Sequence, residues 1–260
     1  MAEDAVRAGA RRDVPLVAAL TGAGISTDSG IPDYRGPNGL WRQDPDAEKL
    51  VTWSYYMADP EIRRRAWKVR QAAAERPVRP NAGHRALVDL ERSGVPVRVL
   101  TQNVDGLHQA AGTPDRKVLE LHGSSREFVC VECGARGPMA EALARVAAGD
   151  PDPACHECGG ILKSSTVMFG ENLDARVLTQ ARAVAAASDV LLAIGSTLQV
   201  HPAAGLVDTA LAGGARVIIV NAEPTPYDRY AERLIREPIS KALPELVYEL
   251  SGLRRPGEAR

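Results

Sequence analysis

Five short apolar runs recur along the chain, and each stops at small or polar residues. The runs span Leu16–Leu20, Val97–Leu100, Val118–Leu121, Asp189–Ile194 and Arg216–Val220. Runs of this length, rich in aliphatic and β-branched side chains and closed by turn residues, are typical of buried strands. The pattern therefore predicts five strands with both faces covered.

Longer stretches between these runs predict helices. Asn81 is placed to cap a helix over Ala82–Ser93, and Leu173–Ala187 and Pro202–Leu211 are rich in alanine. Strands that alternate with helices indicate an α/β fold with a Rossmann-like parallel sheet. Ligands of such sheets bind at the carboxyl ends of the strands, so the loops after the five runs should converge on one cleft.

Two segments interrupt this alternation. Residues 43–80 are charged and carry Trp53 and Trp67, and residues 124–163 hold all four cysteines. We expect a smaller domain beside the sheet, made of a helical insertion and a zinc-ribbon module. The large domain is then discontinuous and takes in residues 15–42, 81–123 and 164–250. Residues 1–14 and 251–260 are expected to be terminal tails.

Composition and charge narrow the class of protein. The 260 residues are 45% hydrophobic and 25% charged, and 32 basic against 33 acidic side chains leave a net charge of -1. A nearly neutral chain gives no sign of general nucleic-acid or membrane binding. No stretch reaches the roughly 20 apolar residues of a membrane span, and the first apolar run is too short for a signal peptide. We expect a cytoplasmic protein, in which cysteines favour metal ligation over disulfides.

The cysteines fall into two pairs with the spacing of a zinc ribbon. Cys130 and Cys133 form the first pair, and after 21 residues Cys155 and Cys158 form the second. Four thiolates suit tetrahedral zinc, and a closed four-sulfur shell is structural because no position stays open for water. The alternative is unrelated thiols or a redox pair. His156 lies inside the second pair and is expected to be an exposed bystander.

A glycine-rich turn follows the first predicted strand. Gly22, Gly24 and Ser26 lie where backbone amides can approach a phosphate, although Thr27 replaces the third glycine of the dinucleotide fingerprint. An ordinary tight turn is the alternative. A second strand and turn at Gly195-Ser196-Thr197, with Asn221-Ala222-Glu223 after the next strand, strengthens the dinucleotide interpretation.

Polar residues also follow the second and third predicted strands. Asn103 and Asp105 lie where a strand gives way to a helix, which helix capping alone would explain. His122 ends an apolar strand at the expected cleft. A lone histidine is more often structural, but its ordinary pKa of about 6.5 suits a general base near neutral pH.

Taken together, these motifs resemble the sirtuin family. The resemblance rests on GAGISTDSGIPDYRG at residues 22–36, TQNVDGLH at 101–108, LHG at 121–123, the two cysteine pairs, GST at 195–197 and NAEP at 221–224. It covers roughly residues 15–250 and implies NAD-dependent removal of acyl groups from lysine side chains of proteins. NAD would be the co-substrate and one structural zinc ion the metal.

The resemblance also implies roles for individual residues. His122 would act as the base on the ribose hydroxyls, with Asn103 and Asp105 in the nicotinamide pocket. The expected NAD contacts are Gly22, Ala23, Gly24, Ser26, Ile31, Tyr34, Arg35, Gln102, Asn103, Asp105, Gly195, Ser196, Thr197, Asn221, Glu223 and Ile239. The acyl-lysine peptide would pair with the strand that contains Val167, Phe169, Gly170 and Glu171.

Three points stay open at the level of sequence. Ser164-Ser165 replace the Pro-Asp of many members, which puts the peptide preference in doubt. Trp67 and Arg70 match the Tyr and Arg that select acidic acyl groups in some members, although Trp67 would equally serve as core. The rival functions are an ADP-ribosyltransferase on the same scaffold and a non-enzymatic zinc-ribbon adaptor.

Overall fold

The computed structural model describes residues 14–33, 39 and 44–252. Its larger sheet is six-stranded and has the order β3-β2-β1-β7-β8-β9. The strands are β1 (Val17–Thr21), β2 (Val97–Thr101), β3 (Val118–Glu120), β7 (Val190–Ile194), β8 (Arg216–Val220) and β9 (Arg233–Ile235). Every neighbouring pair is parallel. The predicted α/β fold is confirmed, and each of the five predicted strands is present to within one residue at either end.

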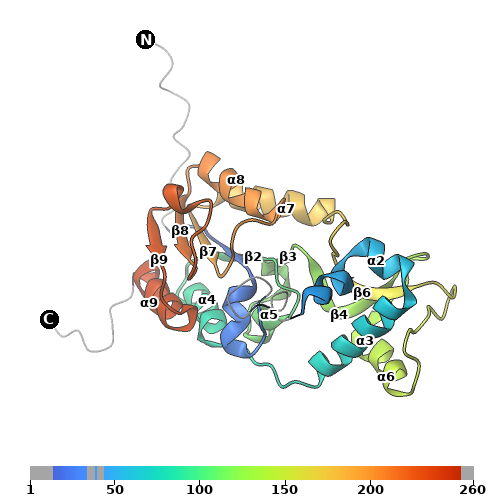
Figure 1. Ribbon diagram of the computed structural model, residues 1–260. Helices are drawn as coiled ribbons and strands as arrows, with labels where there is room; N and C mark the ends of the chain where they lie inside the picture. Colours follow the sequence, from blue (N-terminus) through green and yellow to red (C-terminus); the bar gives the residue numbers. More distant parts are fainter. Residues whose placement is uncertain (1–13, 34–38, 40–43, 253–260) are drawn as a thin grey trace, which may run out of the picture.

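Helices cover both faces of this sheet, as Figure 1 shows. Helices α4 (Ala82–Arg92) and α9 (Ile239–Ser251) lie on one face, and α7 (Ala175–Ala187) and α8 (Leu206–Ala212) lie on the other. Side chains of a strand alternate between these layers, so Val17 and Ala19 pack in the first core and Ala18 and Leu20 in the second. Burial on both sides explains why the strands are continuous apolar runs.

Capping residues set where the predicted helices begin. Asn81 accepts a hydrogen bond from the Gly83 amide (2.9 Å) and starts α4 as expected. Asp174 caps α7 through the amides of Arg176 and Val177, so this helix begins two residues after its predicted start. The predicted helix Pro202–Leu211 is instead a 3-10 turn, η4 (Ala203–Gly205), followed by α8, and no side chain caps either start.

Strand β9 of the large sheet and the last helix, α9, were not predicted from the sequence. Strand β9 has three residues at the edge of the sheet, of which only Ile235 is buried, so it gives no apolar run. Helix α9 contains Pro244 but presents Leu243, Leu246 and Val247 to the core at helical spacing. That spacing was available in the sequence. The helix includes Ser251, the first residue of the expected C-terminal tail, and most of both expected tails falls outside the described residues.

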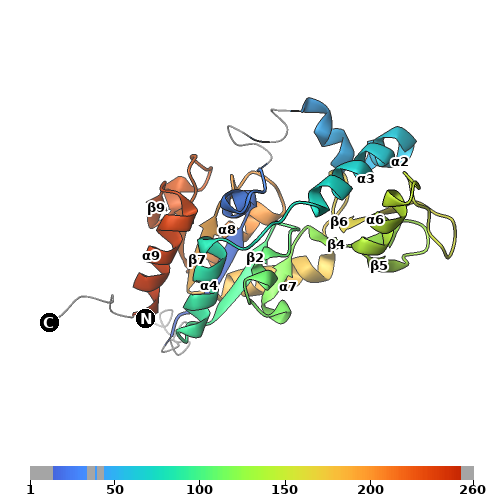
Figure 2. The same ribbon diagram turned by 90° about the horizontal axis from the view of Figure 1, so that it is seen from below.

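A second unit lies beside the large sheet (Figure 2). It contains an antiparallel sheet of order β5-β4-β6, with β4 (Gly123–Cys130), β5 (Arg136–Pro138) and β6 (Leu162–Thr166). Its helices are η2 (Pro45–Val51), α2 (Trp53–Ala58), α3 (Pro60–Ala74) and α6 (Met139–Ala147). Trp67, Cys130, Met139 and Leu162 share its core. Strand β6 crosses the boundary expected between residues 163 and 164, because its pairing with β4 continues to Thr166.

Short 3-10 and α-helical turns connect these elements at the edges of the sheet. They are η1 (Ala23–Ser29), α5 (Leu107–Ala110), η3 (Asp115–Lys117) and η5 (Asp228–Tyr230). Among the residues with an assigned position, no helix has both the length and the apolar character needed to cross a bilayer.

Candidate active site and metal centre

Two glycine-containing loops meet where the strand order reverses, between β1 and β7. The Gly24 amide donates to the Gly195 carbonyl oxygen (2.9 Å). A Cβ atom on Gly22 would lie 2.7 Å from the Gly195 oxygen, and one on Gly24 would lie 2.8 Å from the Gly195 Cα. Glycine is therefore required here by the close packing of two loops. From the sequence we predicted glycine here for the approach of a phosphate; packing against the facing loop is a second reason, and the phosphate contact stays a prediction.

Asn103, Ser26 and Asp105 form a hydrogen-bonded cluster at this edge. The side-chain Nδ2 of Asn103 donates to the Gly22 carbonyl oxygen and to Ser26 Oγ, both at 3.1 Å. Ser26 Oγ donates to Asp105 Oδ2 (2.7 Å), and Asp105 Oδ1 accepts from the Leu107 amide (2.9 Å). Gly106 is the N-cap residue of α5, but one Asp105 carboxylate oxygen still accepts from the first amide of the helix. The other oxygen is held by Ser26.

Two buried histidines lie beneath the cluster. His84 Nε2 is 3.5 Å from Ser26 Oγ, and the His84 and His108 ring centroids are 5.0 Å apart. Burial lowers the pKa of His84 to about 4 and that of His108 to about 3, so both rings are neutral near pH 7. His108 Nε2 lies 3.0 Å from Thr21 Oγ1, while its Nδ1 is buried without a hydrogen-bond partner among the described residues.

His84 was not among the site residues predicted from the sequence. Its signal is the spacing from Asn81, because the His84 ring lies within hydrogen-bonding distance of both the backbone nitrogen (3.4 Å) and Oδ1 (3.2 Å) of Asn81 and closes a capping box. Asn81 also donates to the Ile25 carbonyl oxygen and to Ser29 Oγ. Only the fold brings the start of α4 against η1.

His122 lies between β3 and β4, two residues after the end of β3, and one of its ring nitrogens is engaged. Nδ1 lies 3.0 Å from the Gln102 carbonyl oxygen, which can only accept, so Nδ1 carries the proton in the neutral ring. Burial lowers the pKa of His122 below its ordinary value, and the bond to Gln102 opposes this shift. The ring is therefore held as a neutral imidazole whose Nε2 has a lone pair for a proton, as a general base requires.

The far end of the edge carries the residues expected around adenosine. Gln102 Nε2 donates to Ser196 Oγ (2.9 Å), and Asn221 Nδ2 donates to the Glu223 carbonyl oxygen (2.8 Å). Arg236, which the sequence analysis missed, donates to the carbonyl oxygens of Asn221 and Glu223, both at 2.8 Å. Arg236 is also paired with Asp228 and thereby fixes the loop after β8. Thr197 is half-buried, and Ile239 packs against the core.

The expected peptide-pairing segment is anchored on both sides. The Val167 amide donates to the His122 carbonyl oxygen (2.8 Å), and the Phe169 backbone pairs with Val51 and Trp53 (2.8 and 2.9 Å). Glu171 accepts from the Met168 amide and from buried Lys163, at 2.8 and 2.9 Å. Gly170 has a φ of +94°, which favours glycine. His122 and this segment therefore have a fixed relative position.

The four cysteines come together in space as their spacing predicts. Their sulfur atoms all lie within 4.8 Å of one another, and Sγ–Sγ distances are 3.5 Å for Cys130–Cys158 and 3.7 Å for Cys133–Cys155. A tetrahedron with Zn–S bonds of about 2.3 Å has edges of about 3.8 Å. Backbone amides of Cys158 and Glu157 lower the pKa of Cys155 to about 7, which favours a thiolate. The donor set fits a closed structural zinc site.

Trp67 and Arg70 do not have the arrangement expected of an acyl-selecting pair. Trp67 is 0% exposed and packs with Cys130 and Leu162, which is the core role left open by the sequence. Arg70 lies over the Trp67 and Tyr56 rings, at 5.5 and 5.7 Å to their centroids, and donates to Ser164 Oγ (3.2 Å). A ring without exposed surface does not line a pocket. Of the other expected contacts, Tyr34 and Arg35 fall outside the described residues, and Ile31 is half-buried after η1.

A scan of protein families matches the Sir2 family model, the sirtuins, to residues 22–202. The chain belongs to the Sir2 family. The match takes in the Ser26–Asn103–Asp105 cluster, His122 and all four cysteines. It ends at Pro202, ahead of the loop that Arg236 fixes.

Relatives that match nearly the whole chain support the assignment to this family. A NAD-dependent protein deacetylase 2 of Streptomyces coelicolor is 66% identical over 90% of this chain and 97% of its own length. A NAD-dependent protein deacetylase of Sulfolobus acidocaldarius is 44% identical, with 91% of each chain covered.

Solved Sir2 structures have the same fold. One described as the structural basis for the mechanism and regulation of Sir2 enzymes has a TM-score of 0.82 at 38% identity and covers 92% of this sirtuin and 94% of its own chain. Another, a Sir2–p53 peptide–NAD+ complex, has a TM-score of 0.79 at 33% identity, with coverage of 92% and 95%.

Proposed function

We propose that this sirtuin is an NAD-dependent protein-lysine deacylase that yields nicotinamide, O-acyl-ADP-ribose and free lysine. The observation that carries the proposal is His122, held by Gln102 as a neutral base beside the anchored Val167–Glu171 segment. Family membership and relatives named deacetylases support it. A non-enzymatic zinc-ribbon adaptor would need neither that base nor the cluster at the edge of the sheet.

NAD, when bound, supplies a C1′–nicotinamide bond whose cleavage opens C1′ to the acyl oxygen. We assign the nicotinamide end to Asn103 and Asp105, which Ser26 orients, and the adenosine end to the loops at Gly195–Thr197 and Asn221–Glu223. His122 Nε2 accepts the proton from a ribose hydroxyl so that its oxygen can attack the acyl carbon. Fixed polar groups serve this charge-separating chemistry better than mobile water because they need no reorientation.

The substrate we propose is an extended acyl-lysine peptide. Backbone pairing with residues Val167–Glu171 accepts many side chains and favours a broad range of protein substrates. Solved relatives in complex with a p53 peptide and with a propionylated peptide support this mode. We place the enzyme in the cytoplasm, because the four cysteines are arranged for metal and not for disulfides.

Mass spectrometry of the products tests the function against its main rival. The protein is incubated with NAD and one acetyl-lysine peptide, and nicotinamide, the peptide and the protein are all followed. Deacylation gives equal amounts of nicotinamide, O-acetyl-ADP-ribose and free lysine peptide. Protein-linked ADP-ribose without loss of the acetyl group would show the ADP-ribosyltransferase instead, and no release of nicotinamide would exclude both enzymes.

A further inference from the structure

Strand β4 leaves its partner strand just after His122. From Gly123 to Phe128 it advances five residues, whereas β6 covers only two, from Thr166 to Ser164. The extra residues bulge away from β6 toward the loop after β2. There the Ser125 amide (3.0 Å) and Ser125 Oγ (2.6 Å) both donate to the Val104 carbonyl oxygen. Bulges of this kind redirect side chains beside active sites.

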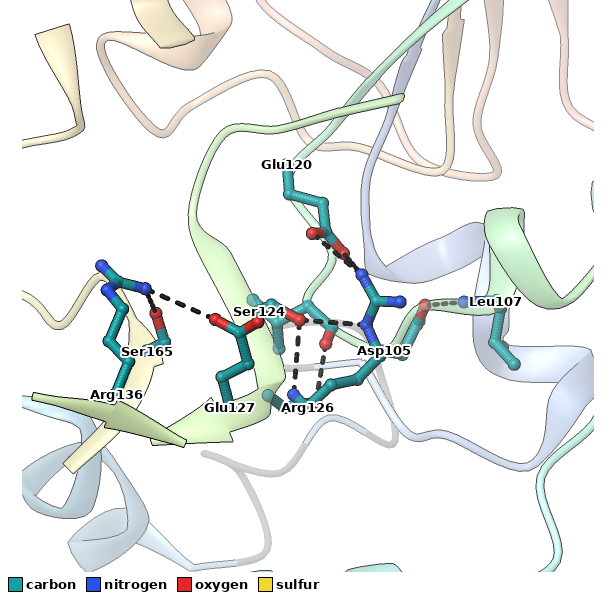
Figure 3. Close-up of polar contacts among 10 residues, drawn as sticks. Asp105, Leu107, Glu120, Ser124, Arg126, Glu127, Arg136 and Ser165 are labelled. Carbon is teal, nitrogen blue, oxygen red and sulfur yellow. Dashed lines mark hydrogen bonds and ion pairs between the residues drawn. The ribbon is translucent and has the colours of Figure 1, made fainter. Parts of the chain in front are cut away.

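Arg126, the next residue, covers Gly106 at the end of the same loop. Gly106 has a φ of +72°, and a Cβ atom on it would lie 3.0 Å from Arg126 Cδ. The guanidinium is itself fixed, because Nε donates to Ser124 Oγ (3.1 Å) and Nη2 lies 3.2 and 3.3 Å from the two Glu120 oxygens (Figure 3). One arginine thus connects β3 and β4 and packs against Gly106 at the end of the loop.

The Asn103–Gly106 loop has contacts on two sides. Its side chains Asn103 and Asp105 bind Ser26, and its backbone at Val104 and Gly106 meets Ser125 and Arg126. The first contacts are between groups already assigned to the nicotinamide pocket. Those on the other side come from β4, the strand that ends at the zinc ligand Cys130.

We propose that Ser125 and Arg126 form a clamp that positions the Asn103–Gly106 loop and thereby sets the affinity of the site for nicotinamide. The inference rests on the proposed function. Neither side chain touches the reacting atoms, so both are positioning residues that act through Asn103 and Asp105. The clamp also gives the zinc module a direct mechanical connection to the nicotinamide pocket through a single strand.

The test measures nicotinamide inhibition of deacetylation in wild type, Arg126→Ala and the double variant Ser125→Ala/Arg126→Ala. Loss of one clamp contact should raise the nicotinamide inhibition constant about 3- to 10-fold, and loss of both should raise it further. The KM for the acetyl peptide should stay within about twofold, because the peptide-pairing segment is anchored elsewhere. Arg126→Lys should restore inhibition, since only one guanidinium nitrogen reaches Glu120 and lysine keeps both the charge and the stem over Gly106.

Arg136→Ala is the matched control. Arg136 lies on the neighbouring strand β5, is similarly half-exposed, and pairs with Glu127 (3.5 Å) and Ser165 Oγ (2.7 Å) without touching the loop (Figure 3). Its nicotinamide inhibition should match that of wild type, with zinc content and melting temperature measured for every variant. Unchanged inhibition in Arg126→Ala, or an equal shift in both arginine variants, would overturn the clamp. An inactive wild type would instead overturn the proposed function.

Discussion

At the scale of single residues, histidines with the same chemistry have different roles because their surroundings differ. His122 keeps one nitrogen on a carbonyl oxygen and the other available, whereas His84 and His108 are fully buried beneath the Ser26 cluster. Within the part of the chain that the structure describes, His108 Nδ1 is buried without a hydrogen-bond partner, which costs free energy beneath the site. Tautomer and burial, which no motif encodes, separate the base from the packing residues.

Replacement of His122 by alanine should abolish turnover while the fold and much of the NAD affinity remain. General base catalysis contributes typically 10²–10⁴-fold, so kcat for deacetylation should fall by at least about 100-fold. Rapid-quench kinetics and NAD titration measure the two quantities separately. His201→Ala, at an exposed histidine between β7 and η4, is the control and should retain full activity. A near-native rate in His122→Ala would remove His122 from the mechanism.

The buried histidines predict that stability declines in mild acid. Their pKa values are about 4 for His84 and about 3 for His108 in the folded protein, against about 6.5 when unfolded. Below pH 6.5 the unfolded chain takes up protons that the folded protein does not. The free energy of unfolding should therefore fall between pH 6.5 and 4, by on the order of 5 kcal/mol from these two groups together.

Urea titrations at several pH values across this range measure the effect. The quantity to compare is the slope of the unfolding free energy against pH. His108→Leu removes one of the two groups and should flatten the pH dependence, whatever it does to stability at pH 7. His201→Leu, at an exposed site, should leave the slope as in wild type. Equal slopes in all three proteins would contradict the assignment.

At the scale of elements, the site depends on loops packed backbone against backbone. The loop at Gly195 is the clearest case. Gly195 has a φ of +61°, and a Cβ atom on it would collide with the backbone of Gly24 and Ile25. Gly195→Ala should push the two loops apart, weaken NAD binding at least about tenfold, and destabilise the protein by about 2 kcal/mol. Calorimetric titration with NAD and urea unfolding measure these effects.

Gly214→Ala separates backbone strain from loop packing. Gly214 has a φ of +86°, but a Cβ atom on it would meet nothing within 4 Å. This variant should show the modest cost of a positive φ, about 1 kcal/mol, and normal NAD affinity. If both glycine variants bind NAD equally well, close packing of the loops does not shape the site.

The zinc module is an element that relies on its metal. Its core is a handful of side chains that includes two of the ligands, Cys130 and Cys155. Cys155→Ala should lose zinc and activity together, because ion binding supplies the folding free energy that so small a core lacks. Zinc content by mass spectrometry and deacetylation are measured side by side. His156→Ala, inside the same knuckle but exposed and not a ligand, should keep both. Full activity without zinc would show that the module folds unaided.

At the scale of the whole molecule, the NAD-binding edge and the small unit meet at the peptide-pairing segment. The backbone of this segment is bound on one side to His122 and on the other to Val51 and Trp53. His122 lies in the large domain, whereas Trp67 and Arg70 lie on α3 of the small unit. Arg70 is occupied with Ser164 and two aromatic rings, and Trp67 offers no hydroxyl to a carboxylate.

We therefore expect neutral acyl groups to be preferred over succinyl. A succinyl carboxylate would lose hydrogen bonds to water on binding, and Arg70 as a single donor would replace only part of them. The measurement is kcat/KM for acetyl, butyryl and succinyl versions of one peptide, and the succinyl value should be the lowest. A succinyl value above both others, abolished in Arg70→Met, would show that Arg70 binds the acyl carboxylate.

The sequence by itself determined the α/β class, five of the six strands of the large sheet, the four clustered cysteines as candidate zinc ligands and His122 as a candidate base. These follow from local rules, because buried strands need apolar runs and a zinc ribbon needs fixed cysteine spacing. The tertiary structure alone decided that Gly22 and Gly24 also serve loop packing, that Trp67 is core, and that His84 lies under the site. Such facts depend on contacts between residues far apart in sequence, which hydrophobic periodicity and short motifs do not record.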